Sequence, residues 1–283
     1  MSSRPKLDRL NNSRKNIRNR IRSFTRGVSK QRVVFVTGVP RSGTNMVLDL
    51  LARSAETEVF FEHDRRIFDR FSHVSDEALL RYAQCSPAPC VVFKSLLDSQ
   101  RQRHLLDLFE DAVALWLFRS CDDVVRSNVT RWPGVRNRID EILEEPVLGG
   151  WRGAGMSDAT LASLRSVYTP ELSDEAANAL FWYLRNQLFF DQELDKDARV
   201  LLLKYEAMVR DPAYLTGLIC NHVGIPYKPA LHGFVHARSV TEDQLSEIPG
   251  DIRALCDGMG TRLDAQWRAQ AGAQPVGSPT QSA

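Results

Sequence analysis

Residues 33–51, VVFVTGVPRSGTNMVLDLL, combine features that proteins use to hold a phosphate or sulfate group. The run 33–36 is apolar without alternation, which is typical of a strand buried on both faces of a parallel sheet. Gly38, Pro40 and Gly43 interrupt this run, and a helix is expected to begin near Gly43. Backbone N–H groups in such a turn converge on an anion, as does the positive end of the helix dipole. We therefore predict a strand, an anion-binding loop and a helix; a tight turn without a ligand is the alternative.

The glycines of this loop have the spacing of a nucleotide triphosphatase loop, but the essential lysine of that motif is missing. Thr44 stands where Lys would contact the β- and γ-phosphates, and Arg41 lies inside the loop. The sequence GVPRSGT resembles the 5′-phosphosulfate loop of sulfotransferases that use 3′-phosphoadenylyl sulfate (PAPS) as the donor. The resemblance implies that these residues bind the donor: Pro40, Arg41, Ser42, Gly43, Thr44 and Asn45.

A second group of residues follows the apolar segment 114–118, which is expected to form a strand. Arg119 ends this strand, and SCDD has the spacing of a capping box, so Ser127 should lie on the second turn of a helix. An arginine in this place can hold a phosphate through charge-assisted hydrogen bonds. Pairing with Asp122 or Asp123 is the alternative.

The block FRSCDDVVRS resembles the part of PAPS sulfotransferases in which an Arg and a Ser bind the 3′-phosphate. A Ser-Cys pair replaces the common Asp-Pro, but Arg119 and Ser127 match. A basic loop that closes on the donor in many members falls at GFVHARSVTE. Arg238 and Ser239 are its candidates here, although the familiar Arg-Lys-Gly sequence is missing.

Three ionisable residues follow the strand expected at 57–61, and ligands of open α/β sheets bind outside the carboxyl ends of strands. Phenol and steroid sulfotransferases place a catalytic His where this chain has Leu96, which cannot act as a base. In protein-tyrosine and some carbohydrate sulfotransferases the base is a Glu at a similar number of residues after the loop. Glu62 stands at that position in this chain. The resemblance therefore implies Glu62 as general base, with His63 second and Asp64 third.

Lys94 ends a further apolar strand, expected at 90–94, and either assists at the sulfuryl group or pairs with an acid. The catalytic candidates are therefore Glu62, Arg41, His63 and Lys94. The His residues show no metal-ligand spacing, and no metal is expected.

Other segments complete an alternation of strands and helices: a strand at 199–205 and helices at 65–71, 99–110 and 173–194. Residues 131–170 are expected to be irregular, and with residues 62–72 they are the expected place of acceptor recognition. The alternation predicts an α/β protein with a P-loop-like three-layer fold, in which helices flank a central parallel sheet.

The 283 residues are 43% hydrophobic and 25% charged, which suits a globular α/β protein. The five cysteines include no CxxC pair, so neither a disulfide framework nor a zinc site is indicated. Nothing resembles a signal peptide or a spanning segment, which favours a cytoplasmic enzyme or an isolated catalytic domain.

Residues 1–32 hold eleven Lys or Arg and one acidic residue, whereas the whole chain has a net charge of only +2. Residues 1–30 are interpreted as a basic, possibly amphipathic-helical arm, and 269–283 as a disordered tail around a domain at 31–268. Three alternatives are open for this arm: it is solvated, it binds a membrane surface, or it docks on the acidic body of the protein. Without a recognisable motif, no nucleic-acid partner is expected.

The resemblance implies an enzyme of the EC 2.8.2 type that moves a sulfuryl group from PAPS to a hydroxyl or amine by in-line transfer and releases PAP. A carbohydrate, a lipid, a peptide tyrosine and a small metabolite all remain open as acceptor. One alternative is a nucleotide or small-molecule kinase with an unusual loop. Another is a non-catalytic nucleotide-binding module docked through its basic arm.

Overall fold

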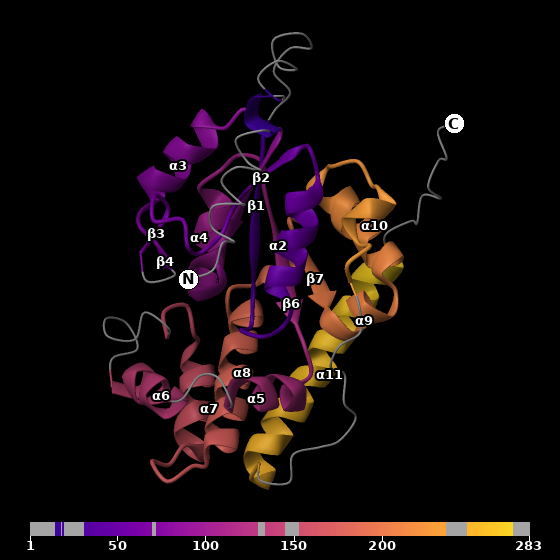
Figure 1. Ribbon diagram of the computed structural model, residues 1–283. Coiled ribbons are helices and arrows are strands. Elements are labelled where there is room, and N and C mark those ends of the chain that lie inside the picture. The colour runs from indigo at the N-terminus through magenta and orange to yellow at the C-terminus, as the bar shows by residue number, and fades with distance from the viewer. Residues whose placement is uncertain are drawn as a thin grey trace.

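Five parallel strands form a central sheet in the computed structural model, which describes residues 15–17, 19, 31–69, 72–129, 134–144, 153–235 and 248–273 (Figure 1). The strands are β1 (Arg32–Gly38), β2 (Thr57–Phe60), β5 (Cys90–Lys94), β6 (Ala112–Phe118) and β7 (Val200–Lys204). Their order in the sheet is β2-β5-β1-β6-β7, which puts β1 in the centre. The predicted α/β class with a central parallel sheet is confirmed.

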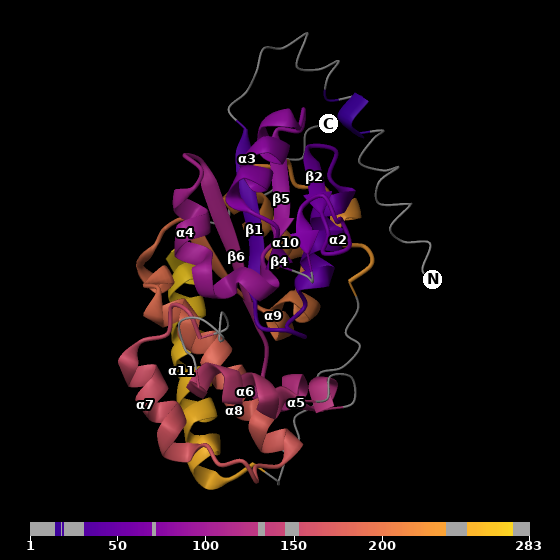
Figure 2. The same cartoon turned by 90° about the vertical axis from the view of Figure 1, so that its left-hand side faces the viewer.

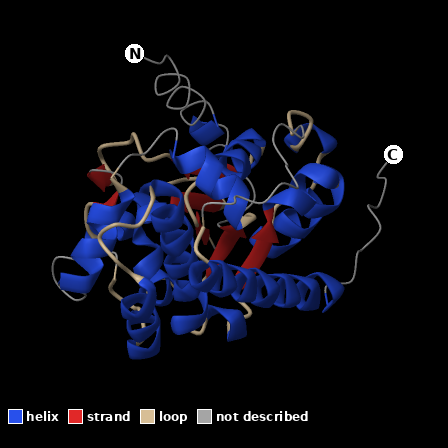
Figure 3. Ribbon diagram, turned by 90° about the horizontal axis from the view of Figure 1, so that it is seen from below, coloured by secondary structure: helices blue, strands red, loops and turns tan. Residues whose placement is uncertain are grey.

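Helices cover both faces of the sheet because β1 is apolar on both. Val34 and Val36 share a core with α2 (Thr44–Arg53) and α10 (Pro212–Val223). Val33 and Phe35 share the other core with α8 (Asp174–Asp191) and α11 (Gly250–Ala273). Figure 3 shows the strands enclosed between helices, as the predicted three layers require. The other elements are β3 (Phe68–Asp69), β4 (Ser72–His73), α3 (Asp76–Cys85), η1 (Leu96–Arg101), α4 (Gln102–Asp107), α5 (Cys121–Val129), α6 (Val135–Glu144), α7 (Asp158–Val167), η2 (Leu194–Lys196), α9 (Tyr205–Arg210) and η3 (Pro229–Leu231).

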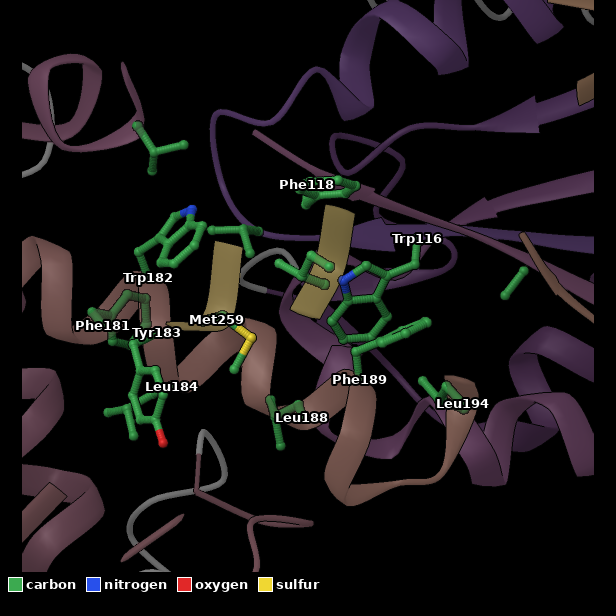
Figure 4. Close-up of a cluster of buried hydrophobic side chains, with 14 of the residues drawn as sticks. Trp116, Phe118, Phe181, Trp182, Tyr183, Leu184, Leu188, Phe189, Leu194 and Met259 are labelled. Carbon is green, nitrogen blue, oxygen red and sulfur yellow. The ribbon is translucent and has the colours of Figure 1, made fainter. Parts of the chain in front are cut away.

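Helix α8 is the centre of the second core. The side chain of Ser173 caps it by accepting from the Ala176 N–H, as its sequence predicted. Trp116 of β6 lies against Phe189 of α8, with ring centroids 5.4 Å apart (Figure 4). Burying an aromatic side chain of this size contributes about 1.5–3 kcal/mol, so this contact fixes α8 to the middle of the sheet.

Helices α5, α6 and α7, with part of α8 and α11, gather at the carboxyl end of the strands (Figure 2). The prediction that 131–170 is irregular was wrong for α6 and α7. Val135, Ile139 and Ile142 recur at helical spacing and are buried, and Ser157 caps α7 by accepting from the Thr160 N–H. The Arg and Gly content of this segment masked these patterns.

The predicted helix at 65–71 was also wrong. The side chain of Asp64 holds a turn by accepting from the Arg66 N–H, and the chain then forms the β3–β4 hairpin. The helix expected at 99–110 is split into η1 and α4. Contacts with other elements override the local pattern here, since Asp98 of η1 accepts from the His73 N–H at 2.9 Å.

Helix α11 covers the edge of β7 and continues to Ala273, into the part of the chain interpreted as a disordered tail. Gln270 accepts from the Leu202 N–H at 2.8 Å and donates to the Val200 carbonyl at 3.1 Å. These two bonds replace the neighbouring strand that β7 lacks. Alanine-rich residues 269–273 have high helix propensity, which explains the extension. Residues 274–283 lie outside the described residues.

Four described residues of the basic arm, 15–17 and 19, are helical and contact the body. Lys15 donates to the Ala52 carbonyl, and Asn19 Nδ2 donates to the Ala55 carbonyl at 3.2 Å. Ala52 lies in the last turn of α2 and Ala55 between α2 and β2, at the amino end of the sheet. Within the described ranges, no helix is both long and apolar enough to cross a membrane.

The end of β1 tolerates only glycine at position 38. Gly38 has φ +125°, and a Cβ there would lie 2.1 Å from the Leu117 carbonyl oxygen of β6. Gly38→Ala should therefore lower the free energy of unfolding by at least about 2 kcal/mol, measured by denaturant titration. Gly217→Ala is the control, because nothing lies within 4 Å of its Cβ and alanine should stabilise α10 by about 0.5–1 kcal/mol. Equal denaturant concentrations at the midpoint of unfolding for the two variants would contradict this prediction.

Two histidines, the buried His73 and the partly buried His222, should make stability depend on pH. Burial lowers the pKa of His73 and of His222 below the ordinary 6.5, because it disfavours the charged imidazolium. Below that value the unfolded chain binds protons that the folded chain does not. The free energy of unfolding should therefore fall as pH drops below about 6.5, by at most about 1.4 kcal/mol per pH unit for each histidine. Denaturant unfolding at a series of pH values measures this slope.

The contribution of His222 can be separated by substitution. Its Nε2 lies 3.0 Å from the Arg199 carbonyl, and the amide of a glutamine can donate to the same oxygen without titrating. His222→Gln should therefore reduce the slope and leave the protein folded. A slope identical to that of the wild type would show that His222 does not titrate as predicted.

Candidate functional site

The carboxyl ends of all five parallel strands meet at one edge of the sheet, and each delivers a polar group. The loop 39–43 follows β1, Glu62 follows β2, Lys94 ends β5, and Arg119 follows β6. Tyr205 follows β7. Since ligands of open α/β sheets bind at this edge, the predicted residues occupy the expected place in the fold.

The loop 39–43 presents the amino end of α2 without a side-chain cap. Gly43 is the N-cap with φ +94°, it makes no side-chain cap to the first turn, and that turn holds no acidic residue. The first N–H groups of a helix have no partner within the helix, so this end suits an anion. Arg41 also has a positive φ, 70°, which costs free energy in a non-glycine residue and is common at functional sites.

The side chain of Arg41 contacts Ser127, which belongs to the second group of predicted residues. Its Nε donates to the Ser127 Oγ of α5 at 2.8 Å. The loop after β1 and the helix after β6 are thereby joined, because β1 and β6 are neighbours in the sheet. The structure thus brings together Arg41 and Ser127, which the sequence placed in two separate motifs.

Lys94 and Glu62 form an ion pair at the other side of the loop. Lys94 Nζ lies 2.6 Å from Glu62 Oε2 and donates to Asn45 Oδ1 of α2 at 3.0 Å. The Lys94 side chain is 4% exposed, whereas that of Glu62 is 23% exposed. A nearly buried cation therefore lies beside the uncapped helix end and holds a carboxylate that solvent can reach.

The other two candidate bases lie apart from this pair. His63 is exposed and stacks on the Phe61 ring at 5.6 Å. The Asp64 carboxylate is 8% exposed and pairs with Arg66. Of these candidate bases, Glu62 is the one that forms an ion pair with Lys94 at 2.6 Å.

Arg119 is held by several groups. Its Nη2 lies 3.0 Å from Asp123 Oδ2, and its guanidinium lies over the Tyr205 ring at 4.4 Å. Trp182 Nε1 donates to the Arg119 carbonyl at 3.0 Å. Asp123 also contacts Arg126 at 3.6 Å, so the cluster of these two arginines and one aspartate carries one net positive charge. The alternative pairing with Asp123 is therefore present, and it leaves a surplus cation.

Tyr205 and Glu206 connect these parts. A Cβ on Gly43 would lie 2.6 Å from the Tyr205 ring, so the ring packs directly against the loop. Glu206 Oε1 accepts from the Ser120 N–H at 2.9 Å and so caps the amino end of α5. Asp122 pairs with Arg253 of α11 instead of Arg119, at 2.9 Å. Tyr205 therefore fixes Arg119 and Gly43 relative to each other.

The other residues that were predicted to bind the sulfuryl donor differ in how far they are exposed to solvent. Ser42 is fully buried and its hydroxyl donates to the Val39 carbonyl at 2.5 Å, while Thr44 is also buried. Pro40 lies in the turn of the loop. Arg238 and Ser239 lie outside the described residues. The sequence did not predict the hydrogen bond from Trp182 to the Arg119 carbonyl, because a helical pattern does not show which carbonyl an indole N–H contacts.

In the part of the chain that the structure describes, no group of three or more His, Cys, Asp or Glu side chains could hold a metal ion. The described cysteines are free thiols.

Solved structures of sulfotransferase domains resemble this fold. The sulfotransferase domain from the curacin biosynthetic pathway aligns with a TM-score of 0.51 and 15% identity, covering 82% of this chain and 99% of that chain. The sulfotransferase domain of the olefin synthase from Synechococcus PCC 7002 has a TM-score of 0.48 and 16% identity, covering 83% and 96%. A sulfotransferase from Alicyclobacillus acidocaldarius has a TM-score of 0.49 and 15% identity, covering 87% and 98%.

Neither the scan against protein-family models nor the search of curated proteins gave a match. The structural alignment with the curacin-pathway domain spans nearly all of that domain and most of this chain. The predicted resemblance is therefore confirmed at the level of the fold: the chain has the P-loop-like α/β fold of sulfotransferase domains.

Proposed function

We propose that the protein transfers a sulfuryl group from PAPS to a hydroxyl or amine acceptor. The observation that carries this proposal is the hydrogen bond between Arg41 and Ser127, 2.8 Å long. Arg41 belongs to the loop expected at the 5′-phosphosulfate, and Ser127 to the pair expected at the 3′-phosphate. Their contact supports a single anion site that takes both the 5′-phosphosulfate and the 3′-phosphate of one nucleotide.

The donor is held by backbone and cationic groups. The uncapped N–H groups at the start of α2 receive the 5′-phosphosulfate, together with Arg41. Arg119 and Ser127 receive the 3′-phosphate, which distinguishes PAPS from ATP. Arg119 is suited to this because Tyr205 and Asp123 already fix its guanidinium, so little side-chain entropy is lost on binding.

Glu62 acts as the general base. As the acceptor oxygen or nitrogen attacks sulfur in line, its proton passes to the Glu62 carboxylate. The bond between sulfur and the bridging oxygen breaks, and the electron pair goes to the 5′-phosphate of PAP, where Arg41 neutralises the charge. Protonation of Glu62 ends its ion pair with Lys94, whose ammonium then becomes available to the sulfuryl oxygens.

Substitution of Glu62 tests the base. Glu62→Gln should lower the rate of PAP release from PAPS in the presence of acceptor at least about tenfold, because glutamine cannot take the proton. PAP affinity, measured by calorimetry, should stay nearly unchanged. Glu56→Gln, at the opposite end of β2, is the control and should retain full turnover. Near-normal turnover of Glu62→Gln would remove this residue from the mechanism.

Substitution of Arg119 tests the 3′-phosphate contact. Arg119→Ala should weaken PAP binding at least about tenfold, because a charge-assisted contact is lost. Binding of adenosine 5′-phosphosulfate, which lacks the 3′-phosphate, should weaken much less. Arg126→Ala is the matched control, since Arg126 contacts the same Asp123 but is not assigned to the phosphate. Equal losses for both nucleotides would refute the assignment.

A further inference from the structure

Strand β2 leaves the sheet just before Glu62, so its pairing with β5 stops before it reaches Lys94. The last paired residues are Phe60 of β2 and Phe93 of β5. Ser95 N–H donates to the Val36 carbonyl of β1 at 2.9 Å. Successive residues of a strand direct their backbone groups to opposite neighbours, so the Lys94 carbonyl is directed toward the β2 side.

A β2 that continued in register would offer the Glu62 N–H to this carbonyl. The chain turns instead: the Phe61 carbonyl accepts from the Asp64 N–H at 2.9 Å. This turn frees the Glu62 side chain to meet Lys94 Nζ. The Lys94 carbonyl therefore lies buried beyond the end of the β2 pairing, and a donor from another element stabilises it there, because a buried carbonyl needs a hydrogen bond.

His73 of β4 supplies the missing donor. Its Nε2 lies 3.0 Å from the Lys94 carbonyl oxygen, and since a carbonyl only accepts, Nε2 carries the proton. Asp98 holds the backbone of the histidine, because its Oδ2 accepts from the His73 backbone N–H at 2.9 Å. The His73 side chain is 0% exposed.

Aromatic rings fix the imidazole in this orientation. The ring of Phe68 lies 5.1 Å from that of His73, and those of Phe93 and Phe35 lie 6.3 and 6.4 Å away. Phe93 and Phe35 come from the two neighbouring central strands β5 and β1. The imidazole is therefore placed by the sheet itself, next to the strand end that carries Lys94.

We infer that His73 is a positioning residue for the Lys94–Glu62 pair: it replaces the strand that departs at Glu62 and holds the end of β5 in place. The inference rests on the proposed function for the part that the pair plays in sulfuryl transfer. The contact between His73 and Lys94, and its effect on the order of Lys94, can be tested without that function.

A matched pair of variants separates the hydrogen bond from packing. His73→Gln keeps a side-chain N–H at about the distance of Nε2, whereas His73→Met has similar length and no donor. The readout is the rate at which acetic anhydride acetylates Lys94, followed by peptide mass spectrometry. Lys204, which pairs with Asp264, is the internal reference in each sample. Because the Lys94 side chain is 4% exposed, its acetylation reports local opening of the site.

His73→Met should raise the ratio of Lys94 to Lys204 acetylation at least about fivefold over the wild type, because the buried carbonyl loses its donor. His73→Gln should stay within about twofold of the wild type. An unchanged ratio in His73→Met, or an equal rise in both variants, would overturn the inference. If His73→Met does not fold, His73→Asn takes its place, because its amide is too short to reach the Lys94 carbonyl.

Turnover then links the contact to the proposed reaction. His73→Met should lower the rate constant for PAP formation from PAPS at saturating donor and leave PAP affinity unchanged, and His73→Gln should restore the rate. A rise in acetylation with no change in rate would limit His73 to a structural part. A wild type that does not bind PAP would contradict the proposed function, while the acetylation result would still decide the positioning contact.

Discussion

The parallel pairing of β1 with β5 on one side and β6 on the other determines the rest of the site. Val36 lies opposite both Lys94 and Leu115, so the ends of three strands reach the same edge of the sheet. This register puts the loop after β1 between Lys94 and Arg119. Neither residue is near the loop in the sequence, and a shift of one residue in either strand would turn its side chain to the other face.

The charges of the site are arranged in two groups on either side of the α2 amino end. On the β5 side the ammonium of Lys94 is balanced by Glu62, and on the β6 side the guanidinium of Arg119 is balanced by Asp123. Arg41 lies in the loop between them and is bound to Ser127. Buried cations need such partners, because desolvation without a counter-charge is costly. We propose that the phosphate and sulfate groups of the bound donor replace some of the ionic contacts that Glu62 and Asp123 make with these cations.

The sequence predicted what depends on local pattern, and missed what depends on contacts between distant residues. The continuous apolar runs at 33–36, 90–94 and 114–118 are typical of strands in a parallel sheet, and the structure has these strands and the loop after the first of them. The hairpin after Asp64 could not be predicted, because it is held by Asp98, a residue of another element. The helices within 131–170 are anchored likewise, since Ser157 donates to Asp191 of α8. Among the site residues, the pairing of Lys94 with an acid was one of two open alternatives, and the structure shows it with Glu62, whereas assistance of Lys94 at the sulfuryl group stays a prediction.

The most direct test of the account is thermal unfolding of the full chain with PAP, ADP and ATP·Mg²⁺ in parallel. A ligand at a hundred times its Kd adds about 2.7 kcal/mol to the free energy of unfolding, which for a chain of this length raises Tm by roughly five to ten degrees. The account predicts such a rise with PAP and little change with ADP or ATP·Mg²⁺. A rise with ATP·Mg²⁺ alone would contradict it and favour a kinase.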